Sequence, residues 1–200
     1  MTDSKISKLK GFMPKHEGKA LTKWSEEFSS IGPIMEIGTY CGKSAMYLSK
    51  GAILNDQLVY TIDHHFGSEE HQINEEYFDN EIFDHKKQRV NTLPLLIKNI
   101  NKMQVENIVP IISNSVVIAS NWNTELGMVF IDGGHSFKAA NDDYESWNIK
   151  IKQNGALVIH DIFENPNEGG QAPFEIFKKA LKSDFEIYER VDTLACLKKK

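Results

Sequence analysis

The chain has 200 residues, of which 40% are hydrophobic and 26% charged, so it is long enough to form one globular domain with a substantial core. Its formal net charge of -5 argues against a nucleic-acid or anionic-membrane surface, and no apolar run approaches the ~20 residues that span a bilayer. The N-terminus lacks the apolar run of a signal peptide, and Cys41 and Cys196 show neither disulfide nor zinc spacing, so we expect a cytoplasmic protein.

Short apolar runs alternate with longer amphipathic segments, which predicts an α/β fold. The predicted strands are residues 33–38, 58–62, 109–112, 128–131, 156–159, 185–189 and 193–197, and Asn154-Gly155 is expected to form a turn before the fifth of them. The predicted helices are residues 43–50, 89–103 and 174–181, with another that contains Asp142 and Trp147. Right-handed crossovers then give a mostly parallel sheet, and the last two strands form a hairpin that makes the last strand antiparallel.

One segment is longer than a crossover requires. About 45 residues separate Asp63 from Val109, more than the usual short connections and one helix need. Within this stretch, residues 64–88 are rich in histidines and acids, which suggests that they are too polar to form a core. The acids are Glu69, Glu70, Glu75, Glu76, Asp79, Glu81 and Asp84. Long insertions beside the carboxyl ends of parallel strands usually cover a site, so we interpret this one as a lid.

The first candidate site follows the first predicted strand. Gly38 and Gly42 let the backbone turn tightly and approach a ligand, and the helix that starts near Lys43 offers free amides to a carboxylate. The spacing is not that of a dinucleotide fingerprint, and an ordinary glycine turn is the alternative. Asp63 ends the second strand, where an acid can accept hydrogen bonds from both ribose hydroxyls; a capping aspartate is the alternative there.

Acids and histidines also follow two later strands. Asp132 and His135 come after the fourth strand, and His160 and Asp161 after the fifth. If these strands are neighbours, Asp132 and Asp161 converge and can hold a hard cation such as Mg²⁺. His135 suits the work of a general base. The alternatives are a histidine that bonds locally at a helix start and, for His160, one that only packs.

Residues 130–136, joined to residues 154–155 and 160–161, resemble the class I S-adenosylmethionine-dependent methyltransferases. The similarity is to the branch with macrocin O-methyltransferase and cephalosporin hydroxylase-like proteins, and it covers residues 31–197. It implies a single Rossmann-like domain over residues 1–200, with S-adenosylmethionine as cofactor and a small molecule as methyl acceptor, most often at oxygen. The resemblance allows a metal ion, most often Mg²⁺, and a homodimer, but it requires neither.

The resemblance also implies roles for particular residues. Those assigned to the cofactor are Glu36, Gly38, Tyr40, Gly42, Ser44, Asp63, His64, Asn114, Ser115 and Asp132. Those assigned to a metal are Asp132, His160 and Asp161, while His135 and Asp132 are assigned to catalysis. Three positions depart from the family: Asn114 stands where an acid is usual, His160 where some metal-dependent relatives have an acid, and Ile162 where catechol-type enzymes have an asparagine ligand.

Two other functions fit part of the pattern. A metal-dependent hydrolase or lyase could use Asp132, His135, His160 and Asp161, but it leaves the glycine loop and Asp63 unexplained. A binding module could keep the cofactor fold without catalysis, because fold alone does not determine function. We favour methyl transfer by in-line displacement, in which the protein mainly supplies proximity and alignment.

Overall fold

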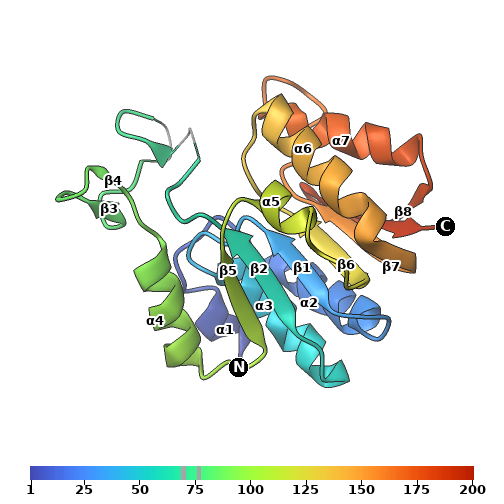
Figure 1. The fold of residues 1–200 in the computed structure, drawn as a ribbon, viewed down its shortest axis with the longest axis horizontal. Helices are drawn as coiled ribbons and strands as arrows, with labels where there is room; N and C mark the ends of the chain where they lie inside the picture. The colour runs from blue at the N-terminus through green and yellow to red at the C-terminus, as the bar shows by residue number, and fades with distance from the viewer. Residues whose placement is uncertain (69–70, 76–77) are drawn as a thin grey trace.

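A seven-stranded sheet forms the centre of the computed structural model, which describes residues 1–68, 71–75 and 78–200 (Figure 1). The strands lie in the order β5-β2-β1-β6-β7-β9-β8. Their bounds are β1 Ile34–Ile37, β2 Val59–Asp63, β5 Ile108–Ile112, β6 Leu126–Ile131, β7 Ile151–Ile159, β8 Phe185–Val191 and β9 Leu194–Lys199. The first five of these run parallel, and β9 runs antiparallel to both β7 and β8. The predicted Rossmann-like sheet with an antiparallel last strand is confirmed.

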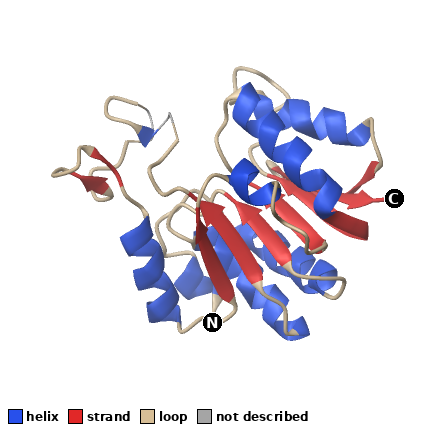
Figure 2. Cartoon of the chain, in the orientation of Figure 1, coloured by secondary structure: helices blue, strands red, loops and turns tan. Residues whose placement is uncertain are grey.

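Helices cover both faces of this sheet (Figure 2). Their bounds are α1 Asp3–Ile6, α2 Lys15–Ser29, α3 Lys43–Ala52, α4 Leu93–Met103, α5 Ser115–Ala119, α6 Phe137–Trp147 and α7 Ala172–Leu181, with 3-10 turns at Ile53–Asn55 and Asn148–Lys150. Within the described ranges, none of the helices combines the length and the apolar character that crossing a bilayer requires.

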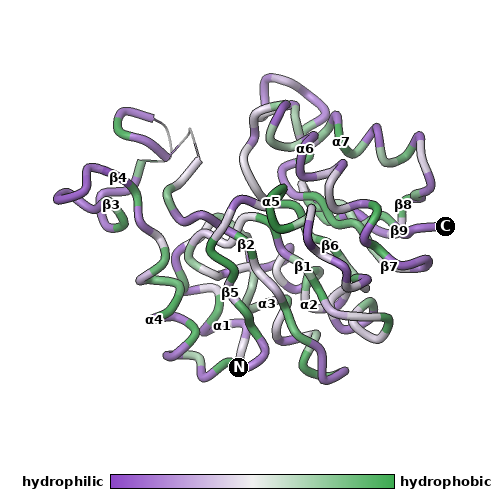
Figure 3. The backbone as a smooth tube through the Cα atoms, viewed as in Figure 1, coloured by the Kyte–Doolittle hydropathy of each residue, from purple (hydrophilic) through white to green (hydrophobic). Residues whose placement is uncertain are grey.

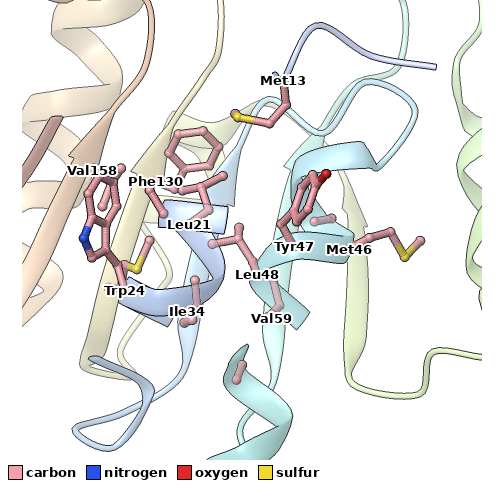
Figure 4. Packing of buried hydrophobic residues seen from close by; sticks show 14 of the residues in the cluster. Met13, Leu21, Trp24, Ile34, Met46, Tyr47, Leu48, Val59, Phe130 and Val158 are labelled. Atoms are coloured by element: carbon pink, nitrogen blue, oxygen red, sulfur yellow. The ribbon is translucent and has the colours of Figure 1, made fainter. Parts of the chain in front are cut away.

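The face covered by α2 and α3 carries one of two large cores. Leu21 and Trp24 of α2 lie with Leu48 of α3 against inward side chains of the strands, among them Phe130 and Val158 (Figure 4). The buried positions of α2 recur every three or four residues, as an amphipathic helix requires. This helix was not among those predicted, because charged residues surround its apolar positions. The second core lies between the opposite face of the sheet and helices α5, α6 and α7.

Two boundaries differ from the sequence prediction by four residues or more. The helix predicted at 89–103 begins at Leu93, because Pro94 has no amide to donate and fits only the first turn of a helix. The predicted turn at Asn154-Gly155 lies inside β7 instead, where Asn154 has a φ of 65° and the pairing with β6 shifts register. The irregularity is therefore a bulge within one strand that begins at Ile151.

The insertion of residues 64–88 extends from the sheet beyond the end of α4 (Figure 1). It contains β3 Phe83–Asp84, which pairs antiparallel with β4 Arg89–Val90. The expectation that this segment is too polar for a core is wrong: Ile82 and Phe83 are buried with Cys41 in a third, small cluster. Polar residues dominate this hairpin along the chain, which hid the apolar ones from the prediction (Figure 3). Three of its acids, Glu69, Glu70 and Glu76, lie outside the described residues.

Candidate functional site

The strand order places a ligand site beside β1. The chain adds β2 and β5 on one side of β1 and then returns to add β6 on the other, so the order reverses between β1 and β6. Open parallel sheets bind ligands at such a switch point, beyond the carboxyl ends of the strands. A cavity of about 470 Å³ opens there, and its walls include Gly38, Asp63 and Asp132. Its volume falls in the range usual for small-molecule and cofactor pockets.

A smaller cavity of about 190 Å³ adjoins the first. The two share part of their lining: Gly38, Tyr40, Ser68, His71, Asp132, Gly133 and His135. The smaller cavity is closed by Phe12 and Met13 of the N-terminal segment. Phe12, Tyr40 and His71 form a cluster of rings at this wall, with centroids 5.3–6.0 Å apart. One continuous cleft therefore runs from the end of β2 to the N-terminal segment.

The glycine loop after β1 adopts left-handed backbone conformations. Gly38 has a φ of 93°, and a Cβ there would collide with the carbonyl oxygen of Asp132 after β6. Gly42 has a φ of 86° and caps α3, where a side chain would collide with Leu96. Glycine is required at both positions, because other residues rarely adopt this conformation and no space is left for a Cβ. The loop thereby brings bare backbone to the cleft between β1 and β6.

Asp63 is held in place by two backbone amides. Its Oδ2 accepts from the Tyr40 amide at 2.8 Å, and its Oδ1 accepts from the His65 amide at 2.6 Å. Each carboxylate oxygen can accept more than one hydrogen bond, so the carboxylate can still bind hydroxyls in the larger cavity that it lines. His64 lines the same wall, and its Nδ1 accepts from the Phe66 amide at 3.0 Å.

Asn114 and Ser115 also line the larger cavity, at the start of α5. The Asn114 side chain caps this helix by accepting from the amides of Val116 and Val117. The Ser115 hydroxyl donates to Asp143, and burial raises the pKa of Asp143 to about 6. Asn114 thus has a structural role in capping as well as a place at the cavity wall.

Not all of the remaining residues assigned to the cofactor line a cavity. Ser44 lines the smaller cavity, whereas Gly42 and Glu36 line neither cavity. Glu36 is completely buried below the glycine loop, where it accepts a hydrogen bond from the Thr61 hydroxyl. Burial raises the pKa of Glu36 to about 8. The structure therefore places Glu36 beneath the cofactor loop and not on the cavity surface.

Three of the predicted acids and histidines converge at the boundary of the two cavities. Asp132, His135 and Asp161 each offer one ligand atom, and these atoms lie within 4.8 Å of one another. The His135 Nε2 lies 3.2 Å from Asp161 Oδ2. Burial raises the pKa of Asp132, while the two imidazoles outweigh the same effect of burial at Asp161 and lower its pKa. Carboxylates and imidazole in this arrangement fit a divalent cation.

His160 is not part of that group. Its Nδ1 lies 2.9 Å from Asp132 Oδ1, and its Nε2 lies 2.9 Å from Oε2 of Glu17, on α2. Burial alone would lower the pKa of His160, but the carboxylates of Asp132, Glu17 and Asp161 outweigh it and hold this pKa well above its usual value. A metal ligand needs a free nitrogen lone pair, and both ring nitrogens already face carboxylates. His160 therefore contacts Asp132 through its Nδ1 and Glu17 through its Nε2, and its role as a metal ligand stays a prediction.

Glu17 was missed by the sequence prediction. It is fully buried, and its Oε1 accepts from the Thr193 amide at 2.9 Å and from the Thr193 hydroxyl at 2.8 Å. A signal exists in the sequence: Glu17 precedes Leu21 by four residues, so it shares the buried face of α2. An acid on the buried face of a helix needs a partner, and His160 and Thr193 provide it.

Comparison with known proteins places this architecture among characterised folds. A family model described as a methyltransferase domain matches residues 35–162. The structure is similar to that of the O-methyltransferase NovP, with a TM-score of 0.68 and 12% identity over 92% of this chain and 80% of that one. It is also similar to the O-methyltransferase TomG from Streptomyces achromogenes in complex with SAM (TM-score 0.63, 15% identity, 94% and 81% covered). An O-methyltransferase from Bacillus cereus in complex with SAH is similar as well (TM-score 0.63, 12% identity, 99% and 87% covered). At these identities the likeness establishes a shared fold.

Proposed function

Because this chain belongs to the family described as a methyltransferase domain, we propose that it transfers the methyl group of S-adenosylmethionine to a hydroxyl of a small molecule. The observation that carries this proposal is the continuous cleft at the switch point of the sheet. Its larger part contains an oriented carboxylate, Asp63, and its junction with the smaller part contains Asp132 and His135. A cofactor region and a region for acid–base chemistry therefore meet at one place.

The larger cavity suits the nucleoside part of the cofactor. Asp63 would bind the ribose hydroxyls, with Asn114, Ser115 and His64 on the wall beside the base. The bare backbone at Gly38 would allow the methionine part to pass close to the end of β1. Once bound, S-adenosylmethionine would supply a methyl group that is activated for transfer by its bond to a positively charged sulfur.

The protein's contribution to the reaction lies at the junction of the cavities. His135 would accept the proton of the acceptor hydroxyl, because its imidazole lines both cavities and Asp161 orients it. Asp132 and Asp161 would hold a divalent cation such as Mg²⁺, which would stabilise the developing oxyanion. A cation that also took His135 as a ligand would remove it as a base, so metal dependence determines which role His135 has.

The insertion of residues 64–88 would act as a lid. Gly67, Ser68 and His71 from this segment line the larger cavity, so its first part lies against the cofactor region. Closure of this lid would exclude water, which otherwise competes for the hydrogen bonds that align the reactants.

The side chains of Asp132, His135 and Asp161 could also serve a metal-dependent hydrolase. That function would leave Asp63 and the glycine loop without a role, and the family that matches this chain does not support it.

A calorimetric titration with S-adenosylhomocysteine, with and without a chelator, tests this proposal. We expect binding in both conditions, because Asp63 is not one of the residues that would hold the cation. Transfer of radiolabelled methyl from S-adenosylmethionine to a panel of small hydroxyl compounds should follow, and Asp132→Asn should reduce it. Absence of any S-adenosylhomocysteine binding would contradict the proposal and would favour the hydrolase.

A further inference from the structure

Lys43, the first residue of α3, differs from the other lysines around the cleft. Its side chain lines the smaller cavity, and its Nζ donates to the carbonyl oxygen of Gly11 at 3.1 Å. It forms no ion pair with any carboxylate in the described part of the chain, and burial lowers its pKa. An ammonium that is partly removed from water without a counter-charge is unfavourable, so this position suits an anionic ligand.

Two neighbouring lysines show the contrast. Lys50, on the same helix, forms an ion pair with Asp3 at 2.6 Å. Lys10, on the N-terminal segment, pairs with Asp79 and Glu81 of the insertion. Both of these ammonium groups have their counter-charges within the protein. Lys43 has a neutral carbonyl oxygen in that place, and a carboxylate would be the stronger acceptor.

The surroundings of Lys43 identify the anion by its chemistry. Ser44, the next residue of α3, lines the same cavity. Gly38 and Tyr40, which line both cavities, connect this place to the Asp63 end of the cleft. A molecule whose ribose lay at Asp63 would thus extend along the glycine loop toward Lys43. In S-adenosylmethionine, the group at that far end is the α-carboxylate of the methionine part.

We propose that Lys43 binds the α-carboxylate of the cofactor and so selects ligands that carry the amino-acid part. This inference rests on the proposed function, because it takes S-adenosylmethionine as the occupant of the cleft. It adds a binding residue that the family resemblance did not include. It also links the cofactor to the N-terminal segment, since Gly11 packs against the Lys43 side chain and a Cβ on Gly11 would lie 2.9 Å from the Lys43 Cβ.

The inference is tested by comparing how two ligands bind to the wild type and to the variant Lys43→Met. S-adenosylhomocysteine has the carboxylate, whereas 5′-methylthioadenosine keeps the adenine, ribose and sulfur and lacks the amino-acid part. Calorimetry should show that Lys43→Met weakens S-adenosylhomocysteine binding by about 10- to 100-fold, the range for loss of a charge-assisted hydrogen bond. Binding of 5′-methylthioadenosine should stay within about 2-fold of the wild type, well below the loss of such a bond. Lys43→Arg should retain most of the S-adenosylhomocysteine affinity, because it keeps a cation at the site.

Lys50→Met is the matched control, since it removes a lysine from the same helix outside both cavities and should change neither affinity. Equal losses for the two ligands would overturn the inference, because Lys43 would then shape the site as a whole. Unchanged S-adenosylhomocysteine affinity in Lys43→Met would overturn it as well, while leaving the proposed function intact. A wild-type protein that bound neither ligand would instead contradict the proposed function itself.

Discussion

The two ends of the cleft are built in different ways. At the end that we propose for the cofactor, the polar groups are held by the loops that follow β1 and β2: Asp63 accepts from the amide of His65 and from that of Tyr40, 23 residues earlier. At the end that we propose for catalysis, His160 is held by Glu17, which is 143 residues away, and Glu17 in turn by Thr193, 176 residues away. One end is therefore organised by its own loops, and the other by the packing of the whole fold.

This difference determines how each end should respond to mutation. A change at the cofactor end should alter ligand affinity, because its groups face the cavity and their protein partners are backbone amides. A change at the catalytic end should alter stability as well, because its partners are buried ions. Removing one member of a buried ion pair leaves an uncompensated charge, whereas removing an exposed group leaves water to replace it.

Glu17→Leu should give the largest effect. It keeps a side chain of similar size but removes the carboxylate that faces His160 Nε2 and leaves the Thr193 amide without its acceptor. We expect a loss of about 3–5 kcal/mol in the free energy of unfolding, measured with urea. The double variant Glu17→Leu/His160→Leu should recover part of this loss, because it removes both charges.

His16→Gln is the control for Glu17→Leu, because His16 precedes Glu17 on α2 and also contacts the β8–β9 turn. Its ion pair with Asp192, at 2.9 Å, is exposed, so we expect a loss below about 1 kcal/mol. If Glu17→Leu cost no more than His16→Gln, the catalytic end would not depend on its buried pair.

Glu36→Gln tests the one buried acid beneath the cofactor loop. Burial raises the pKa of Glu36 to about 8 in the folded state from 4.5, so between these values the folded protein keeps a proton that the unfolded chain releases. The wild type should therefore lose stability as pH rises through this window, by up to about 1.4 kcal/mol per pH unit. Glu36→Gln lacks this ionisation, so its stability relative to the wild type should increase from pH 5 to pH 8, as urea titrations at several pH values would show. A constant difference would mean that Glu36 is ionised in the folded protein.

The same contrast explains how much of the site could be predicted from the sequence. Gly38 and Asp132 directly follow strands and Asp63 ends one, so the strand pattern predicted their positions, as it predicted that Asp132 and Asp161 converge. The sheet itself was predictable because its strands are short apolar runs with turn signals between them. His160 was found by the same reasoning, but its contacts were not, because nothing near it in sequence indicates that both ring nitrogens face carboxylates.

The remaining errors have a common cause in tertiary contacts. Glu17 and Lys43 act through partners on distant segments, and α2 was missed because only its buried face is apolar. The hairpin of the insertion was judged too polar, although Ile82 and Phe83 are buried against Cys41 of the glycine loop. Local composition reflects the average exposure of a segment, whereas a few buried residues determine where it packs.

Asp63→Ala should give a smaller effect than the change at the buried pair, and its main effect should be on ligand binding. The variant loses a charged acceptor for the ribose hydroxyls. We therefore expect the binding free energy of S-adenosylhomocysteine to weaken by about 1.5–3 kcal/mol, which lowers its affinity roughly 10- to 150-fold. Asp142→Asn, which changes another acid on the same cavity, should leave the affinity unchanged. Calorimetry on both variants measures this, with circular dichroism to verify folding, and equal affinity for Asp63→Ala and the wild type would exclude Asp63 from the site.

The insertion should show the smallest effect, divided between its two parts. Residues 64–68 and 71–75 contribute Gly67, Ser68 and His71 to the larger cavity, so bound S-adenosylhomocysteine should cover them. Their amide hydrogen exchange should therefore slow on binding, because bound ligand opposes the local opening from which these amides exchange. The hairpin of β3 and β4 is already anchored by Phe83 and Val90, which are buried with Cys41, so its exchange should change little. Equal protection of residues 64–75 with and without ligand would show that they are a fixed wall and not a lid. Slowing of both parts together would instead show that the whole insertion moves as one unit, and the small core beneath it would then be part of the closure.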